Sequence, residues 1–343
     1  MTRARGAPGP DTGPEPDTGP VRVRRGPRPV PVLVGVLVVA AVAVVLVPDR
    51  LGLDGTLPVV AFVLVRAPAT ILVVVLALLA LAVRARWWPT VVPVLLVAAV
   101  SVAALLPRVL PDGPGPDPGP DLVVMTLNVD RGSADVAALS RLLHLRRPDV
   151  VVLPEAGEPF RARLAPAIAD LGYRSWSSTP AARADAEGST ILAGPSLGAV
   201  RADVVGDVSF PWLQLSGGAL GRTQLVGVHL ASPVPTLIGA WPAELASLQR
   251  WCGPAAGPAA VVGDLNATAD LAAYRTGTAG CTDAGDAAGK GLLATWPTAT
   301  PRWLGAQLDH VLVGGGVGVD GFDVVQVPGT DHRGVLCTVH IVS

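Results

Sequence analysis

The sequence predicts a mixed α/β sandwich that follows a membrane region of three apolar helices. Two observations support this prediction. Uncharged apolar runs dominate the chain before residue 110, and short apolar strands alternate with helical patterns after residue 121. The chain has 343 residues, of which 50% are hydrophobic, and its mean hydropathy is +0.50. That average is too apolar for a typical soluble protein, so we expect part of the chain to lie in a membrane.

Residues 1–29 are predicted to form a disordered tail. They consist of proline, glycine and charged residues, with almost nothing to bury. The end of this tail is basic, with Arg22, Arg24, Arg25 and Arg28.

The membrane region covers residues 30–107. Its first apolar run is long enough to cross a hydrocarbon core of about 30 Å. A signal peptide is the rival interpretation, but the run exceeds a typical signal core and no A-x-A cleavage site follows it. Arg66 interrupts the second run, and we expect it to snorkel to the interface while residues 57–65 lie along the membrane. The predicted spans are about 30–47, 67–83 and 88–107.

The distribution of arginine predicts the orientation of these spans. The tail and the 84–87 loop are arginine-rich, whereas the 48–55 loop carries only Arg50. The positive-inside rule therefore places the N-terminus in the cytoplasm and residues beyond 108 outside it, in a multi-pass protein of the plasma membrane. If Arg66 divides the apolar runs so that the number of spans changes, the domain would face the cytoplasm. Residues 108–120, rich in Pro, Gly and Asp, are predicted to be a semi-rigid linker.

Residues 121–343 carry the predicted sandwich. Helical spacing of apolar residues occurs at 134–148 and at 240–251. The predicted strands are 122–127, 149–153, 189–193, 224–229, 259–263, 309–313 and 335–341.

Cysteine content and net charge limit the chemistry. The three cysteines form no C-x-x-C pair, so a thiolate zinc site is not expected. A bridge between Cys252 and Cys281 and three reduced, buried thiols are both compatible with the sequence. The net charge of −1 predicts no nucleic-acid partner.

Polar residues stand at the ends of the apolar strands. If these ends meet at one edge, carboxylates, amides and imidazoles would share a cleft, and these are the groups of metal-assisted phosphoryl transfer. Each residue alone also has an ordinary structural explanation as a turn, a cap or a satisfied core histidine, so the hypothesis depends on the set. The set is Asn128, Glu155, His229, Asp264, Asn266, Asp309, Asp331 and His332.

In this order the motifs resemble those of the endonuclease/exonuclease/phosphatase superfamily, which includes deoxyribonuclease I. "MTLNV" and "PDVVVLPEA" resemble its T-x-N and D-x-x-x-L-Q-E motifs, and "GVHL" and "GDLNA" resemble its H-L and G-D-F-N motifs. "LDHVLV" and "TDHRGV" resemble its D-H/Y-I and S-D-H-R motifs. The resemblance covers about 121–343 and implies a four-layer β-sandwich of the deoxyribonuclease I-like type.

The resemblance also implies roles for the site residues. Glu155 would be the main ligand of Mg²⁺ or Mn²⁺, with Asn128 and Asp331 assisting it. Asp264 would orient or deprotonate the attacking water, while Asn266 and His229 would bind the phosphate. Asp309 would hold His332 so that its imidazole meets the developing negative charge.

The sequence departs from the family pattern at three positions. Pro154 replaces a Gln, Leu265 replaces an aromatic residue and Thr330 replaces a Ser. None of these is a metal ligand, and Leu265 is expected to turn into the core. The remaining histidines, His144, His310 and His340, are expected to be structural, and His310 should point away from the site.

The predicted function is hydrolysis of a phosphate ester or pyrophosphate by a membrane-anchored enzyme. The three spans suggest a phosphorylated lipid or envelope substrate, because they hold the site near the bilayer. This arrangement resembles a bacterial subgroup of the family associated with teicoplanin-type antibiotic resistance. An extracytoplasmic nuclease and a non-catalytic binding module are the alternatives; nucleic acid is the less favoured substrate, and no obligate protein partner is inferred.

Overall fold

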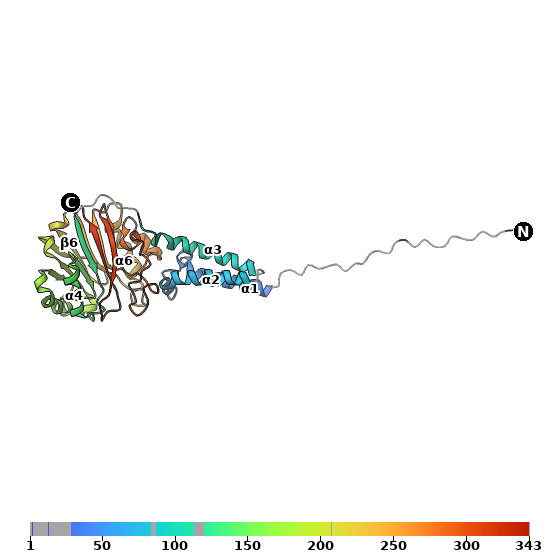
Figure 1. Ribbon diagram of the computed structural model, residues 1–343, viewed down its shortest axis with the longest axis horizontal. Coiled ribbons are helices and arrows are strands. Elements are labelled where there is room, and N and C mark those ends of the chain that lie inside the picture. Colours follow the sequence, from blue (N-terminus) through green and yellow to red (C-terminus); the bar gives the residue numbers. More distant parts are fainter. Residues whose placement is uncertain are drawn as a thin grey trace.

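The computed structural model describes residues 2, 13, 29–83, 87–112, 120–206 and 208–342. Three helices project from one side of an α/β domain, and the strands of this domain run across the direction of the helices (Figure 1). The predicted tail, apart from residues 2, 13 and 29, lies outside the described residues, as do 84–86 and 113–119.

The three projecting helices pack against one another through small and branched apolar residues. Leu46 and Val47 at the end of α1 contact Ala98 of α3, and Ala77 of α2 lies against Val91 of α3. Two helical segments, Arg66–Val83 and Trp88–Arg108, are long and apolar enough to cross a membrane, whereas the apolar segment Val32–Leu46 of α1 is shorter. The helices are α1 (Pro29–Leu46), α2 (Arg66–Val83) and α3 (Trp88–Leu105), and the short 3-10 helices beside them are η1 (Pro48–Leu51), η2 (Val59–Val65) and η4 (Leu106–Arg108).

Two expectations about this region are wrong. Arg66 does not snorkel to an interface: it is 1% exposed, and its guanidinium donates to Asp270 of the α/β domain. Residues of η2 do not lie along a membrane surface, since Val60 and Val63 pack into the apolar core beneath one sheet of that domain. In both cases the α/β domain provides the contact: Asp270 pairs with Arg66, and the core beneath the sheet buries Val60 and Val63.

Each half of the α/β domain is a six-stranded sheet. One sheet has the order β11-β12-β1-β2-β4-β3, and the other has the order β5-β6-β7-β8-β10-β9. Each contains one central parallel pair, β1–β2 and β7–β8, flanked by antiparallel neighbours. A parallel pair requires a crossover, which α4 supplies in the first sheet, and α6 and α7 in the second.

The strands are β1 (Asp121–Thr126), β2 (Val150–Pro154), β3 (Arg174–Ser177), β4 (Ser189–Ala193), β5 (Val200–Val205), β6 (Trp212–Gly217), β7 (Gln224–His229), β8 (Ala259–Asp264), β9 (Thr282–Asp283), β10 (Asp309–Gly314), β11 (Gly318–Val325) and β12 (Gly334–His340). The helices are α4 (Val136–Arg146), α5 (Glu158–Leu164), α6 (Trp241–Ser247), α7 (Gln249–Cys252), α8 (Ala272–Gly277) and α9 (Ala284–Ala287). Further 3-10 helices are η5 (Ala165–Leu171), η6 (Asp185–Glu187), η7 (Pro195–Leu197) and η8 (Gly218–Leu220).

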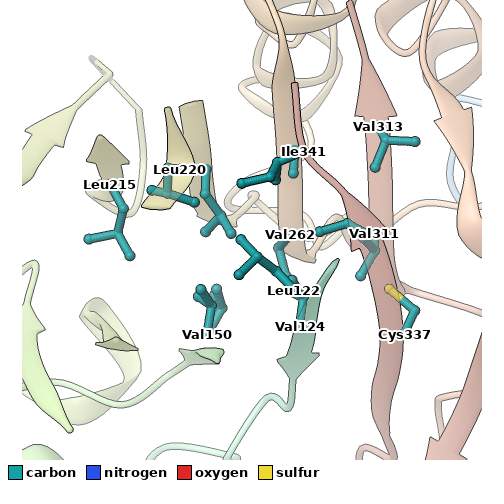
Figure 2. Packing of buried hydrophobic residues seen from close by; sticks show 14 of the residues in the cluster. Leu122, Val124, Val150, Leu215, Leu220, Val262, Val311, Val313, Cys337 and Ile341 are labelled. Carbon is teal, nitrogen blue, oxygen red and sulfur yellow. The ribbon is translucent and has the colours of Figure 1, made fainter. Parts of the chain in front are cut away.

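Three apolar cores hold the layers together. The two sheets meet face to face through residues such as Val124, Val150, Leu215, Val262 and Val311 (Figure 2). A second core lies between one sheet and helices α4 and α5, and a third lies between the other sheet and helices α6, α7 and α8. The order of layers is helix, sheet, sheet, helix, which agrees with the predicted sandwich.

The structure contains every predicted strand within a residue or two, but five strands were not predicted: β3, β5, β6, β9 and β11. The predicted helix at 240–251 is divided at Leu248 into α6 and α7. The helix predicted at 134–148 is α4, which Asp135 caps by accepting a hydrogen bond from the Ala138 amide.

The structure also decides between the two cysteine alternatives. Cys252 and Cys281 form a disulfide that joins α7 to the segment before β9. Cys337 is a buried free thiol, and burial raises its pKa to about 12, so it is not reactive.

Substitution of Gly227 tests the close approach of the two sheets. A Cβ at this position of β7 would lie 2.7 Å from Ile191 Cδ1 and 3.0 Å from Val152 Cγ1 across the interface. We expect G227A to lower the free energy of unfolding by about 1–3 kcal/mol. G239A is the matched control, because nothing lies within 4 Å of a Cβ there. Thermal unfolding that showed equal losses for the two variants would contradict this packing.

Candidate active site

One line of strand register brings three of the predicted residues side by side. Asp264 ends β8 and stands opposite His229 in parallel β7 and opposite Asp309 in antiparallel β10. All three side chains are buried. Leu265, the next residue, is fully buried in the core beneath this sheet, so the chain alternates between site and core.

The other sheet contributes an amide and a carboxylate. Asn128 follows β1 and Glu155 follows β2, and these strands are parallel, so both side chains leave the same edge. Asn128 Nδ2 donates to Glu155 Oε1 at 3.0 Å and to Asp264 Oδ2 at 2.9 Å. One amide group therefore joins the polar ends of the two sheets.

His332 closes the cluster. Its Nδ1 lies 2.8 Å from Asp309 Oδ2, and its Nε2 lies 3.8 Å from Asp264 Oδ2. Thr330 positions the segment by donating to the Asn128 carbonyl and accepting from the His332 amide. The Asp309 carboxylate thus sets the orientation of the imidazole.

Burial and neighbouring charges separate the two site histidines. Burial opposes the charged form of His332, but the Asp309 and Asp264 carboxylates outweigh it and raise its pKa to about 10. Burial lowers the pKa of His229, so this imidazole is neutral. Burial raises the pKa of Asp264 although His332 opposes the shift. The surroundings of the site therefore favour the charged form of His332, the neutral form of His229 and a more basic Asp264 carboxylate.

Two site residues have a left-handed backbone, which is uncommon for residues other than glycine. Glu155 has a φ of 57° and Asn266 has a φ of 48°. Glu155 is held by the Arg131 amide, which donates to its Oε2 at 2.9 Å. Asn266 is held by its own amide, which donates to Asp264 Oδ1, and by its side chain, which donates to the Leu230 carbonyl. Conformations of this kind concentrate at functional sites.

The structure places Asp331 and Asn266 less centrally than the other predicted residues. Asp331 is at the exposed rim, 4.0 Å from His332 Nε2, and accepts a hydrogen bond from Trp296 Nε1. The Asn266 amide already donates one hydrogen to Leu230, which leaves one for a substrate.

Sequence reasoning missed several residues that shape the site. The Phe210 ring stacks on His229 with ring centroids 4.5 Å apart, and the Thr295 hydroxyl accepts from the Asp309 amide. Arg333 donates to four carbonyls, those of Ala294, Pro297, Thr298 and Thr300, and so holds the loop beside the site. Only Arg333 carried a signal in the sequence, through its place after His332.

His310 points away from the cluster, as expected from strand alternation. Its Nδ1 lies 2.6 Å from Asp283 Oδ2, and its Nε2 lies 3.0 Å from the Ala267 carbonyl. His310 therefore supports the segment after Asn266. His144 lies 2.8 Å from the Ser140 carbonyl and 3.0 Å from Asp170, and His340 lies 2.8 Å from Asp121. Both are remote from the cluster.

The sequence profile of the Endonuclease/Exonuclease/phosphatase family matches residues 125–332. This range begins at the first site motif and ends at His332, so it contains the whole cluster. The chain belongs to this family. No curated protein sequence matches the chain.

Two solved TDP2 structures have a similar fold, and one further solved structure is similar at a lower score. A humanized D. rerio TDP2 is 20% identical with a TM-score of 0.52, over 64% of this chain and 98% of that one. Caenorhabditis elegans TDP2 is 20% identical with a TM-score of 0.50, over 71% and 80%. A family protein of Beutenbergia cavernae is 19% identical with a TM-score of 0.48, over 64% and 72%. At such identities the likeness concerns the fold alone.

As a member of the Endonuclease/Exonuclease/phosphatase family, the chain is a metal-dependent hydrolase of phosphate ester bonds. Its donor set suits a divalent cation, because the carboxylates of Glu155 and Asp264 both accept from Asn128 Nδ2 and that of Asp331 lies at the rim beside them. Asp264, Asp309 and His332 also lie within 4.8 Å of one another. The Glu155 carboxylate, which accepts from Asn128 beside this group, can supply a further oxygen ligand for the cation.

The residues of this family member divide the chemistry between them. When bound, the cation neutralises charge on the phosphate. Asp264 lies beside Asn128 and, with its raised pKa, can accept a proton from a water molecule. If protonated, His332 would be able to donate from Nε2 to the negative charge that develops on phosphoryl oxygens. Neutral His229 and the free hydrogen of Asn266 can position the same phosphate.

Removing the carboxylate of Asp264 tests its role. We expect D264N to lower kcat by about 10²–10⁴-fold with little change in KM, because a general base acts in the transition state. D203N, on edge strand β5, is the control. Steady-state hydrolysis of a soluble phosphodiester in the presence of Mg²⁺ measures both constants. A kcat of D264N equal to that of the wild type would exclude Asp264 as the base.

The raised pKa of His332 predicts a pH-dependent stability. A group whose folded pKa exceeds its unfolded value of about 6.5 stabilises the fold fully below that pH and loses this effect as the pH approaches 10. The difference in melting temperature between the wild type and H332Q, without metal, should therefore shrink between about pH 6 and pH 10. A constant difference would mean that His332 is neutral in the folded protein.

Proposed function

We propose that this chain is a membrane-anchored phosphoesterase of the extracytoplasmic face, with Mg²⁺ or Mn²⁺ at Glu155. Its substrate is a phosphorylated lipid or an envelope precursor, such as a phospholipid or a polyprenyl pyrophosphate. The observation that carries the proposal is the buried contact between the apolar helices and the catalytic domain. In this contact Arg66 donates to Asp270, which follows Asn266 closely in the sequence. If the helices cross a bilayer, this contact would keep the catalytic domain close to it.

The apolar helices support a membrane location with three spans. α1 and α3 end next to the domain and α2 begins there, so their order matches a chain that crosses three times. Large apolar side chains on the outer face of the bundle, such as Leu33, Leu72 and Leu96, are more than half exposed. In water such a surface would be costly, whereas in a bilayer it is favourable.

The disulfide supports an extracytoplasmic domain. Cys252 and Cys281 are bonded, and structural disulfides persist mainly outside the reducing cytoplasm. The arginine-rich tail and the 84–87 loop favour the same orientation by the positive-inside rule.

A panel of substrates tests the proposed activity. The purified full chain in detergent micelles is expected to hydrolyse a polyprenyl pyrophosphate or a phospholipid with Mg²⁺, to lose activity in EDTA, and to regain it with Mg²⁺ or Mn²⁺. E155Q should need a much higher Mg²⁺ concentration for half-maximal activity. Turnover of DNA or RNA without turnover of any lipid would favour a nuclease and reject the lipid substrate.

A reporter at the C-terminus tests the side of the membrane. Alkaline phosphatase fused after residue 343 folds only outside the cytoplasm, and we expect it to be active, whereas a fluorescent protein that folds only in the cytoplasm should be dark. The opposite pattern would place the site in the cytoplasm.

A further inference from the structure

We infer that the membrane helices do more than tether the enzyme: Arg66 and Arg108 are positioning residues for catalysis. They act through Asp270, which follows the catalytic residues Asp264 and Asn266 on the same loop. This inference rests on the proposed phosphoesterase activity and extends it, because it assigns part of the active-site geometry to the anchor.

Asp270 is the contact between the anchor and the loop. Arg66, at the start of α2, donates from Nη1 to Asp270 Oδ1 at 3.0 Å. Arg108, just beyond α3, donates from Nη1 to Asp270 Oδ2 at 2.8 Å. Each carboxylate oxygen thus accepts from a different membrane helix segment, and all three residues are buried. Buried charge-assisted hydrogen bonds are directional and strong.

Further contacts tie the same region of the domain to the anchor. Asp54 accepts a hydrogen bond from the amide of Ala272, the first residue of α8, and so caps a helix whose own N-cap residue, Leu271, has no capping side chain. Asp49 accepts from Arg275 of α8 at 2.9 Å. Val60 of η2 packs in the same apolar core as Leu271.

The loop between Asn266 and Asp270 is short and densely bonded. His310 lies 3.0 Å from the Ala267 carbonyl, and Arg275 donates to the carbonyls of Ala269 and Asp270. Because these hydrogen bonds hold the backbone between the two residues, we expect a displacement of Asp270 to be transmitted to Asn266.

Asn266 is the residue most sensitive to such a shift. Its left-handed backbone, with a φ of 48°, persists only where surrounding contacts hold it. Its amide donates to Asp264 Oδ1 at 2.8 Å. Loosening the loop would therefore disturb the orientation of the Asp264 carboxylate.

Conservative substitutions at the junction test this inference in the full chain. In D270N, Arg66 keeps Asp49 at 3.5 Å and Arg108 keeps Asp286 at 3.2 Å, so neither guanidinium loses every acidic partner. In R66Q, Asp49 keeps Arg275. R146Q is the control, since it removes a similar Arg–Asp pair, with Asp323, that is remote from the site and exposed.

The substrate should be water-soluble bis-p-nitrophenyl phosphate, which does not need the bilayer. For D270N and R66Q we expect kcat to fall about 10- to 100-fold with KM within about twofold, and for R146Q no change. The double variant should be no slower than the slower single variant, because both substitutions break one contact. A helix bundle that acted only as a tether would leave kcat unchanged, and independent destabilisation would give additive losses; either result overturns the inference.

Hydrogen exchange separates this inference from the proposed activity. Amides of residues 265–271 should exchange faster in D270N and R66Q than in the wild type and R146Q. If the wild type hydrolyses no phosphodiester or lipid, the proposed function fails, and exchange alone decides the coupling. Equal exchange in all four proteins then rejects the inference.

Discussion

The site depends on the register of β8 between its two neighbours. Because Asp264 pairs with His229 on one side and with Asp309 on the other, neighbouring strands place three side chains at the spacing of a sheet, about 4.8 Å. A slip of one residue would turn Asp264 into the core and bring Leu265 to its place in the site. The same register turns Leu265 into the core. The register that packs this sheet is therefore also the one that assembles the site.

The site also requires that the two sheets pack with their polar strand ends next to each other. Asn128 donates to Asp264, and His332, which precedes β12, lies against Asp309 of β10, so hydrogen bonds from both sheets converge on one cluster. The apolar layer between the sheets sets their distance, and the close approach at Gly227 shows that no spare space remains there. Burial of the cluster raises the pKa of Asp264, while the Asp309 and Asp264 carboxylates raise the pKa of His332.

The sequence predicted the part of the fold that follows local patterns. β1, β2, β7 and β8 are central and apolar, and each ends at or just before a polar site residue: Asn128, Glu155, His229 and Asp264. The edge strand β5 is half-exposed, and β11 carries Asp320, Gly321 and Asp323 within its length, so neither has the apolar alternation that marks a strand. Arg66 and Asp270 are 204 residues apart, and no spacing rule connects them. Because the sequence does not reveal Asp270 as its partner, Arg66 within an apolar run was predicted to reach the membrane interface.

The contact between the helices and the domain buries the charges of Arg66, Arg108 and Asp270, although apolar contacts alone could hold the two parts together. Val60 and Val63 supply apolar contact with the domain, but such contact is non-directional and would tolerate sliding. The hydrogen bonds from Arg66 and Arg108 to Asp270 are directional, and they favour one arrangement of helices and domain. Burying these charges costs desolvation energy, which specificity of arrangement can justify. An enzyme that needed only to stay at a membrane would not require this arrangement, whereas one whose catalytic loop must keep a strained residue in place would.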